Sequence, residues 1–172
     1  MRRQITALAI VALVATACAS DPVQPAGVGA MNMGDPSATP ANVVPNAELA
    51  VGAFEVLETA PAGYGRLSGT AALARHANGT TVTVELAGLL PATEFIAHVH
   101  GGDCGEAGGD HFKFDASGGD MPPNEIHLRF TSDSAGAAVM TVENSATAGT
   151  GARSLVIHPV TLMDAKVACA EF

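Results

Sequence analysis

Residues 126–131 of this 172-residue chain alternate strictly between apolar and polar side chains. A two-residue period is that of a β-strand with one buried face and one polar face. Other short apolar runs are separated by turn residues and lie at 51–57, 67–75, 80–86, 95–100, 137–142, 155–158 and 167–170. No long stretch has the period of a helix. This pattern predicts an all-β domain, a Greek-key β-barrel or sandwich.

Two connections in this pattern differ in kind. Asn78-Gly79 joins two runs, and this dipeptide is the strongest short signal for a hairpin. The glycine-rich stretch 101–123 is far longer than a turn and is followed by the alternating run. We therefore expect a compact barrel that carries one long functional loop.

The N-terminus predicts export. Arg2 and Arg3 precede an apolar run at 5–17 that is too short for a comfortable membrane span and ends in small residues, as in a secretory signal. Val14-Ala15-Thr16-Ala17-Cys18 resembles a bacterial lipobox, in which Cys18 is lipidated and becomes the mature N-terminus. We expect a signal peptide at 1–17 and a membrane-anchored lipoprotein in the periplasm or at the cell surface. A simple cleaved signal, with Cys18 unmodified, is the alternative.

Residues 18–46 contain five separate prolines and no sustained apolar period. Such composition predicts a flexible, proline-rich tether that follows the lipidated residue. The ordered domain is then expected at 47–172, which is long enough for one domain with its own core.

The cysteines also fit an exported protein. Without Cys18, an even pair remains, Cys104 and Cys169. In an oxidising compartment such a pair is expected to form a disulfide, and two buried free thiols are the alternative.

Histidines dominate the chemistry of the chain. His98 and His100 are two apart in a predicted strand, so both imidazoles can point to one side. His111 and His158 supply two more downstream. Converging imidazoles suit copper or zinc better than calcium or magnesium.

The chain is acidic, with a formal net charge of −9. Removal of Arg2 and Arg3 with the signal leaves 6 basic and 17 acidic residues, a net charge of −11. This charge favours solubility and argues against nucleic acid as a partner.

Together these motifs give the chain a family resemblance over residues 47–172. The matching motifs are His98-Val99-His100, Gly102-Asp103-Cys104, Gly109-Asp110-His111-Phe112, Gly151-Ala152-Arg153-Ser154-Leu155-Val156-Ile157-His158 and Ala168-Cys169, in this order. In these motifs the chain resembles the copper-zinc superoxide dismutase family. The resemblance implies a Greek-key barrel with a metal site on its outer face.

The resemblance also implies site residues and an activity. His98, His100, His111 and His158 fall on the copper ligands, and Cys104 and Cys169 fall on the family's disulfide. The implied reaction is copper-dependent dismutation of superoxide to dioxygen and hydrogen peroxide outside the cytoplasm. His111 falls on the ligand that binds and releases copper during the cycle. Lys166 stands where the family has an arginine that orients the anion.

The family's zinc ligands are not matched. Ser117 stands at one zinc histidine, and an ungapped alignment places Pro123 and Ile126 at the other histidine and the aspartate. A shifted alignment places His127 in the zinc site, but the strand pattern puts it on the polar face, where a solvated histidine is expected. Zinc is therefore not expected, and the chain resembles the copper-only branch of the family. His76, in the hairpin turn, is expected at the surface.

Three further features bear on function. The loop that guides superoxide in the family is reduced to residues 159–164. Without zinc, the second nitrogen of His111 needs another partner, for which Glu125 and Asp120 are the candidates.

The short loop, Lys166 and the acidic charge leave an alternative function, a periplasmic copper-binding carrier with little catalysis. A structural sandwich with vestigial histidines is a third hypothesis. The oligomeric state stays open, a homodimer included.

Overall fold

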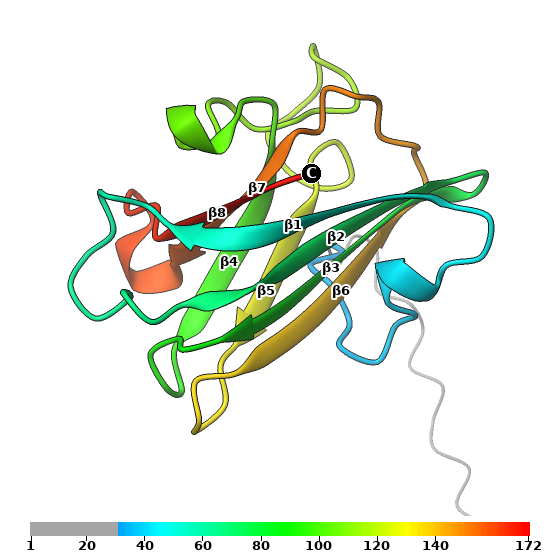
Figure 1. Cartoon of the computed structure of the whole chain (residues 1–172). Helices are drawn as coiled ribbons and strands as arrows, with labels where there is room; N and C mark the ends of the chain where they lie inside the picture. The colour runs from blue at the N-terminus through cyan, green and yellow to red at the C-terminus, as the bar shows by residue number, and fades with distance from the viewer. Residues whose placement is uncertain (1–30) are drawn as a thin grey trace, which may run out of the picture. The chain divides into compact units, whose positions relative to one another are not determined.

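The computed structural model describes residues 31–172, which form one compact unit. Eight strands make up one antiparallel sheet that curls into a nearly closed barrel (Figure 1). They are β1 (Glu48–Val56), β2 (Ser68–His76), β3 (Gly79–Ala87), β4 (Glu94–His100), β5 (His127–Thr131), β6 (Ala138–Asn144), β7 (Ser154–Pro159) and β8 (Ala168–Glu171). The predicted all-β class is confirmed. The predicted signal peptide, Cys18 and the first part of the tether lie outside the described residues.

The strand order is β5-β4-β7-β8-β1-β2-β3-β6. Neighbours that are distant in sequence, such as β4 with β7 and β3 with β6, give the Greek-key crossovers. β1 joins the two halves of the barrel, because its first six residues pair with β2 and its last three pair with β8. The predicted hairpin is present, with His76 paired to Gly79 where β2 turns into β3.

Alternation along each strand decides which side chains fill the barrel. Ile126, Leu128 and Phe130 are buried in the core, as their period predicts. Phe95 of β4 also points inward and stacks on Phe130, with ring centroids 5.8 Å apart. Since residues two apart share a face, the alternate residues of β4, including His98, point outward.

A long loop at 101–126 covers this outward face. A short 3-10 helix, η2 (Cys104–Glu106), begins it, and isolated bridges pair His111 with His100 and Lys113 with Glu125. The loop therefore returns along the end of β4 before it enters β5. It buries side chains that would otherwise be on the solvent face of the sheet.

Cys104 and Cys169 form a disulfide with an S–S distance of 2.02 Å, as the cysteine count predicts. The bond joins the start of the loop to β8 across 65 residues of sequence. In the chain-entropy account, a crosslink over such a loop stabilises the fold by about 4 kcal/mol. The loop is thus fixed to the barrel at its origin.

The structure differs from the expected tether in its last part. From Met31 onward the chain belongs to the compact unit, and a 3-10 helix, η1 (Ala41–Val43), lies against β2 and β3. The ordered domain therefore begins about sixteen residues earlier than the proline pattern indicates. Backbone hydrogen bonds, which composition does not reveal, hold this segment.

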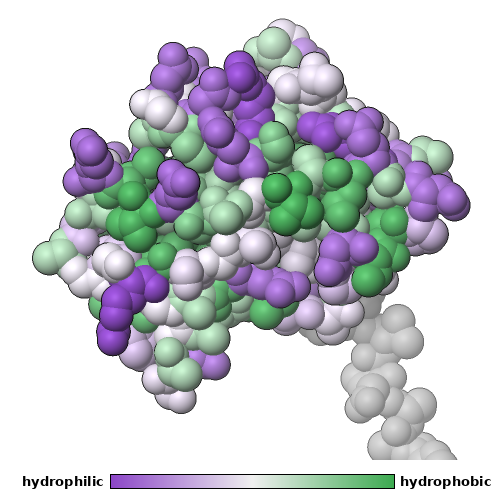
Figure 2. Space-filling model, in the orientation of Figure 1, coloured by the Kyte–Doolittle hydropathy of each residue, from purple (hydrophilic) through white to green (hydrophobic). Residues whose placement is uncertain are grey.

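Figure 2 shows the face that carries β1, where apolar side chains lie in separate groups divided by polar and charged ones. Within residues 31–172, no helix is long and apolar enough to cross a membrane.

Candidate metal site

The site begins with the outward face of β4. His98 and His100 are 4% and 1% exposed, because the long loop covers them. His98 Nδ1 is buried and has no hydrogen-bond partner in the protein. Burial of an unpaired imidazole nitrogen is costly unless something binds it.

The tautomers of two histidines are set by backbone carbonyls. His100 Nδ1 donates to the carbonyl oxygen of Gly109 at 3.0 Å, and His158 Nδ1 donates to that of Met163 at 2.9 Å. Since a carbonyl only accepts, both Nδ1 atoms carry the proton, and each Nε2 keeps a lone pair. Both Nε2 atoms are buried and unpartnered. Nitrogens in this state could bind a metal.

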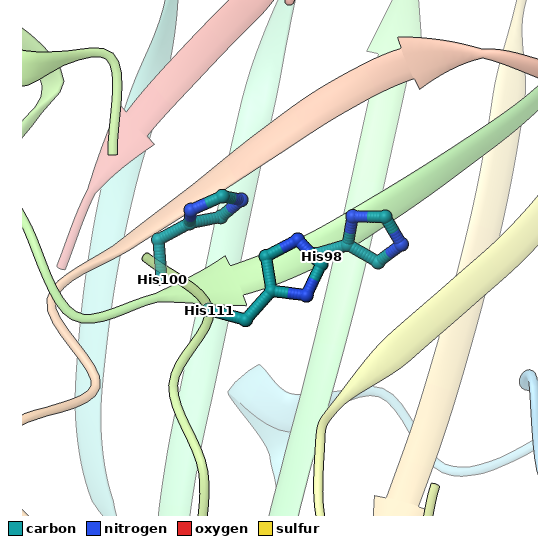
Figure 3. Close-up of side chains that lie close together, drawn as sticks. All are labelled: His98, His100 and His111. Atoms are coloured by element: carbon teal, nitrogen blue, oxygen red, sulfur yellow. The ribbon is translucent and has the colours of Figure 1, made fainter. Parts of the chain in front are cut away.

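His111 is brought to these histidines by the loop. The backbone N–H of Phe112 donates to the carbonyl of Val99 at 2.9 Å, which fixes the loop against β4. One ligand atom each of His98, His100 and His111 lies within 4.8 Å of the others. Figure 3 shows these three rings gathered at the end of β4.

His158 of β7 adds the fourth imidazole. Its ring centroid lies 5.2 Å from that of His98 and 6.4 Å from that of His100. The register pairs Ile96 with His158, so His158 is a neighbour of His98 on the same outer face. The four predicted ligands therefore lie near one another, and three of them, without His158, have ligand atoms within 4.8 Å of one another.

A carboxylate lies behind His111. Glu125 is 1% exposed, and its Oε2 accepts from His111 Nδ1 at 2.7 Å. Of the two partners considered for His111, the structure places Glu125 there. Asp120 is exposed and pairs with Lys113. The second nitrogen of His111 is thus hydrogen-bonded to a carboxylate.

The expectation of a solvated His127 is wrong. His127 is 3% exposed, and its Nε2 donates to the same Glu125 Oε2 at 2.7 Å. It does share the polar face with Arg129, as predicted, but the loop covers that end of the strand. His111, Glu125 and His127 form a second group whose ligand atoms lie within 4.8 Å.

Burial controls the protonation of the cluster. Desolvation, with repulsion from the neighbouring imidazoles, lowers the pKa of His98 to about 2. Desolvation also lowers the pKa of His100 to about 4. The pKa values of His127 and His158 are lowered as well, again mainly by desolvation. The imidazoles of His98, His100, His127 and His158 are therefore neutral at ordinary pH, which is the state that binds metals.

A cleft of about 890 Å³ opens onto His100 and His111. It is also lined by charged groups, which are Asp110, Lys113, Asp120, Glu125 and Lys166. Lys166 Nζ donates to the carbonyl of Ala107 at 2.7 Å. The predicted anion-binding residue is therefore at the rim of the cleft, attached to the loop.

The residues present suit a metal ion that binds imidazole, such as copper or zinc. The donors are four imidazoles, three of which hold a buried nitrogen without a protein partner, and soft or borderline metals prefer such ligands. Sequence reasoning missed His127 as part of the site. The observation that identifies it is the register that pairs His127, the first residue of β5, with His98, and the sequence alone does not give this register.

No protein-family model and no curated protein matches the chain. Among solved structures, it is similar to the Cu/Zn superoxide dismutase from Brucella abortus, with a TM-score of 0.52 and 21% sequence identity. The alignment covers 72% of this chain and 99% of that one. At this identity the similarity establishes the fold and assigns no residue a role.

Proposed function

We propose that this protein is an exported, copper-dependent superoxide dismutase of the copper-only kind. The observation that carries the proposal is the set of buried, unpartnered nitrogens, His98 Nδ1, His100 Nε2 and His158 Nε2. His98 and His100 form one cluster with His111, the ring of His158 lies 5.2 Å from that of His98, and the cleft opens onto His100 and His111. A fold without a metal would leave these three buried imidazole nitrogens without a partner.

Bound copper would supply one-electron chemistry that oxidises one superoxide and reduces another. The chain would hold the metal through four imidazoles, and hydrogen bonds set the tautomers of three of them, His100, His111 and His158. His111 is the least buried of the four, with a third of its side chain exposed, and it stands on the loop rather than on a strand. It is therefore the ligand we propose to bind and release copper, with Glu125 holding its other nitrogen and its orientation.

The hydrogen bonds around Glu125 support the absence of zinc. Glu125 Oε2 accepts from both His111 Nδ1 and His127 Nε2, so each ring has one nitrogen paired without an ion, while His127 Nδ1 is buried and has no protein partner. A structural zinc site normally has four ligands, and this cluster offers three. We propose that the carboxylate takes the structural place of zinc behind His111.

Lys166 is proposed to attract the anion. The overall charge repels superoxide, but screening limits distant charges to about 8 Å at physiological salt. At the cleft, Lys166 and the metal would supply the local positive charge. Its ammonium lacks the planar fork of arginine, so it would attract the anion without fixing its orientation.

Export and anchoring remain part of the proposal. A disulfide between Cys104 and Cys169 is typical of an oxidising compartment. Lipidation at Cys18 would attach the domain to a membrane. Mass spectrometry of the mature N-terminus tests this part, since a diacylated Cys18 supports it and an unmodified N-terminus contradicts it.

The activity is tested by loading the purified protein with copper and measuring superoxide removal. We expect His158→Ala to abolish copper-dependent removal, because it deletes a proposed ligand that stands on strand β7 and not on the long loop. His76→Ala is the matched control, since the His76 side chain bonds to Thr81 in the hairpin, remote from the cluster, and its removal should leave activity unchanged. Copper-loaded protein that is no faster than His158→Ala would refute the enzyme proposal.

A copper carrier is the second candidate. The observation that favours it is the engagement of Lys166 Nζ with the carbonyls of Ala107 and Gly109, which reduces its availability to a substrate. A carrier should transfer Cu(I) rapidly to a chelator and show negligible dismutation. If Lys166→Ala lowers the dismutation rate at constant copper content, the carrier hypothesis is contradicted.

A further inference from the structure

The barrel has a seam. β5 and β6 stand at the two ends of the strand order, and neither pairs with the other in the sheet. The outer backbone groups of such edge strands are normally left to solvent or to another chain, and exposed edges promote aggregation. In this protein, part of the N-terminal segment lies along the seam.

Residues 32–35 bond to both edges. The carbonyl of Met33 accepts from the backbone N–H of Arg129 in β5 at 2.8 Å. Two residues later, the N–H of Asp35 donates to the carbonyl of Thr141 in β6 at 2.7 Å. Asn32 Nδ2 donates to the next outward carbonyl of β6, that of Glu143, at 2.7 Å. The segment therefore bridges the two edges that the sheet leaves open.

Gly34 is required for this close approach. Its φ is +108°, a conformation that other residues rarely adopt. A Cβ atom there would lie 2.7 Å from Met140 Sδ and 2.9 Å from the backbone oxygen of Thr141. Only glycine lets the segment lie this deep in the seam.

The segment then covers the outer face of the neighbouring strands. The N–H of Ala41 donates to Thr83 Oγ1 at 2.9 Å, and this hydroxyl bonds to Thr141 Oγ1 at 2.8 Å. Ala41 is 1% exposed and packs on Ala72 and Ala74 of β2. Thus the hydroxyls of two buried threonines and a small apolar cluster depend on this segment.

We propose that residues 32–41 are a built-in strap that closes the barrel seam and steadies β5. Arg129, which the strap binds, is two residues after His127 and four after Glu125, the groups behind His111. This inference rests on the proposed copper site and gives a role to residues that are remote from it. Release of the strap weakens copper retention although every ligand is kept.

Hydrogen exchange in the mature chain tests the strap without copper. The Asp35 and Arg129 amides should be protected in the wild type, and Gly34→Ala should speed their exchange about tenfold or more. Gly65→Ala is the matched control, because a Cβ there meets nothing within 4 Å. Asn32→Ala, which deletes two exposed hydrogen bonds, to Glu143 and from Gly34, gives a milder variant should Gly34→Ala fold poorly. An Asp35 amide that exchanges at the rate of an unstructured chain in the wild type overturns the strap.

Copper release to a chelator tests the link to the site. We expect faster release from Gly34→Ala than from wild type, and no change in Gly65→Ala. Faster exchange with unchanged copper release would overturn the link. If the wild type retains no copper, the proposed function fails, while the exchange measurement still decides whether the strap exists.

Discussion

His98 of β4 and His127 of β5 are direct partners in the sheet register, and their ring centroids lie 4.3 Å apart. The register places both imidazoles on the outer face, and the long loop then buries both. His127 is therefore a structural member of the site, joined to His111 through Glu125.

His127→Ala should destabilise the protein without emptying the copper site. The variant removes a buried ring and one of the two donors to Glu125, a loss of about 1–3 kcal/mol in the free energy of unfolding. Because His127 is not among the copper donors, copper should still bind. Denaturant unfolding and copper content check both points. A loss of copper as complete as that in His98→Ala would make His127 a ligand.

Glu125→Gln should weaken copper binding by about 10- to 100-fold, because partners of metal-binding histidines orient the ring and raise its basicity. An amide in place of the carboxylate cannot accept two N–H groups as strongly as Oε2 does here. Competition with a chelator measures the affinity. Asp120→Asn, an exposed carboxylate paired with Lys113, is the control and should change little. If both variants bind copper as tightly as the wild type, Glu125 does not contribute to copper binding.

Gly108→Ala should disturb His100 through the backbone. A Cβ at this position, where φ is +83°, would lie 2.6 Å from Val156 Cγ2 and 2.9 Å from His100 Cγ. Overpacking of this kind costs about 1–3 kcal/mol. We expect a lower melting temperature and weaker copper binding. In Gly105→Ala, where a Cβ meets nothing within 4 Å, neither should change.

The metal-free protein should lose stability as the pH falls. His98 and His100 titrate near 2 and 4 in the folded state but near 6.5 when unfolded. Below pH 6.5 the unfolded state therefore binds protons at these two histidines, whereas the folded state does not. Their contribution to the free energy of unfolding is fully present above pH 6.5. Below pH 6.5 this free energy falls by about 1.4 kcal/mol per pH unit for each group, until the folded-state pKa of that group is reached. His98 continues to contribute to this fall below pH 4.

Urea unfolding at pH 6.5 and 4.5 measures this loss. His98→Gln has no titrating group at this position. As the pH falls, its free energy of unfolding should therefore decrease less steeply than that of the wild type, by about 1.4 kcal/mol per pH unit. Equal stabilities of the wild type at the two pH values would contradict the account.

The sequence predicts most of the fold because its signals are local. The alternation of Ile126, Leu128 and Phe130 identifies a strand and its inward face, and the even cysteine pair identifies the disulfide. It also supplies the four histidines, since His98 and His100 share a strand face.

The sequence could not predict what covers each surface. His127 is on the polar face of β5, and only the path of the loop decides that this end of the face is buried. For the same reason, Glu125 and Asp120 were equal candidates for His111. The segment after Met31 has the composition of a tether, and its backbone bonds to β5 and β6 are invisible in composition.

Copper and zinc content per chain, measured together after dialysis against a weak chelator, tests the central claim most directly. The account predicts one copper per chain and no retained zinc in the wild type, and no copper in His98→Ala. One equivalent of zinc that survives dialysis and is lost in His127→Ala would show that the Glu125 cluster is a metal site. Wild-type protein that retains no copper would contradict the account as a whole.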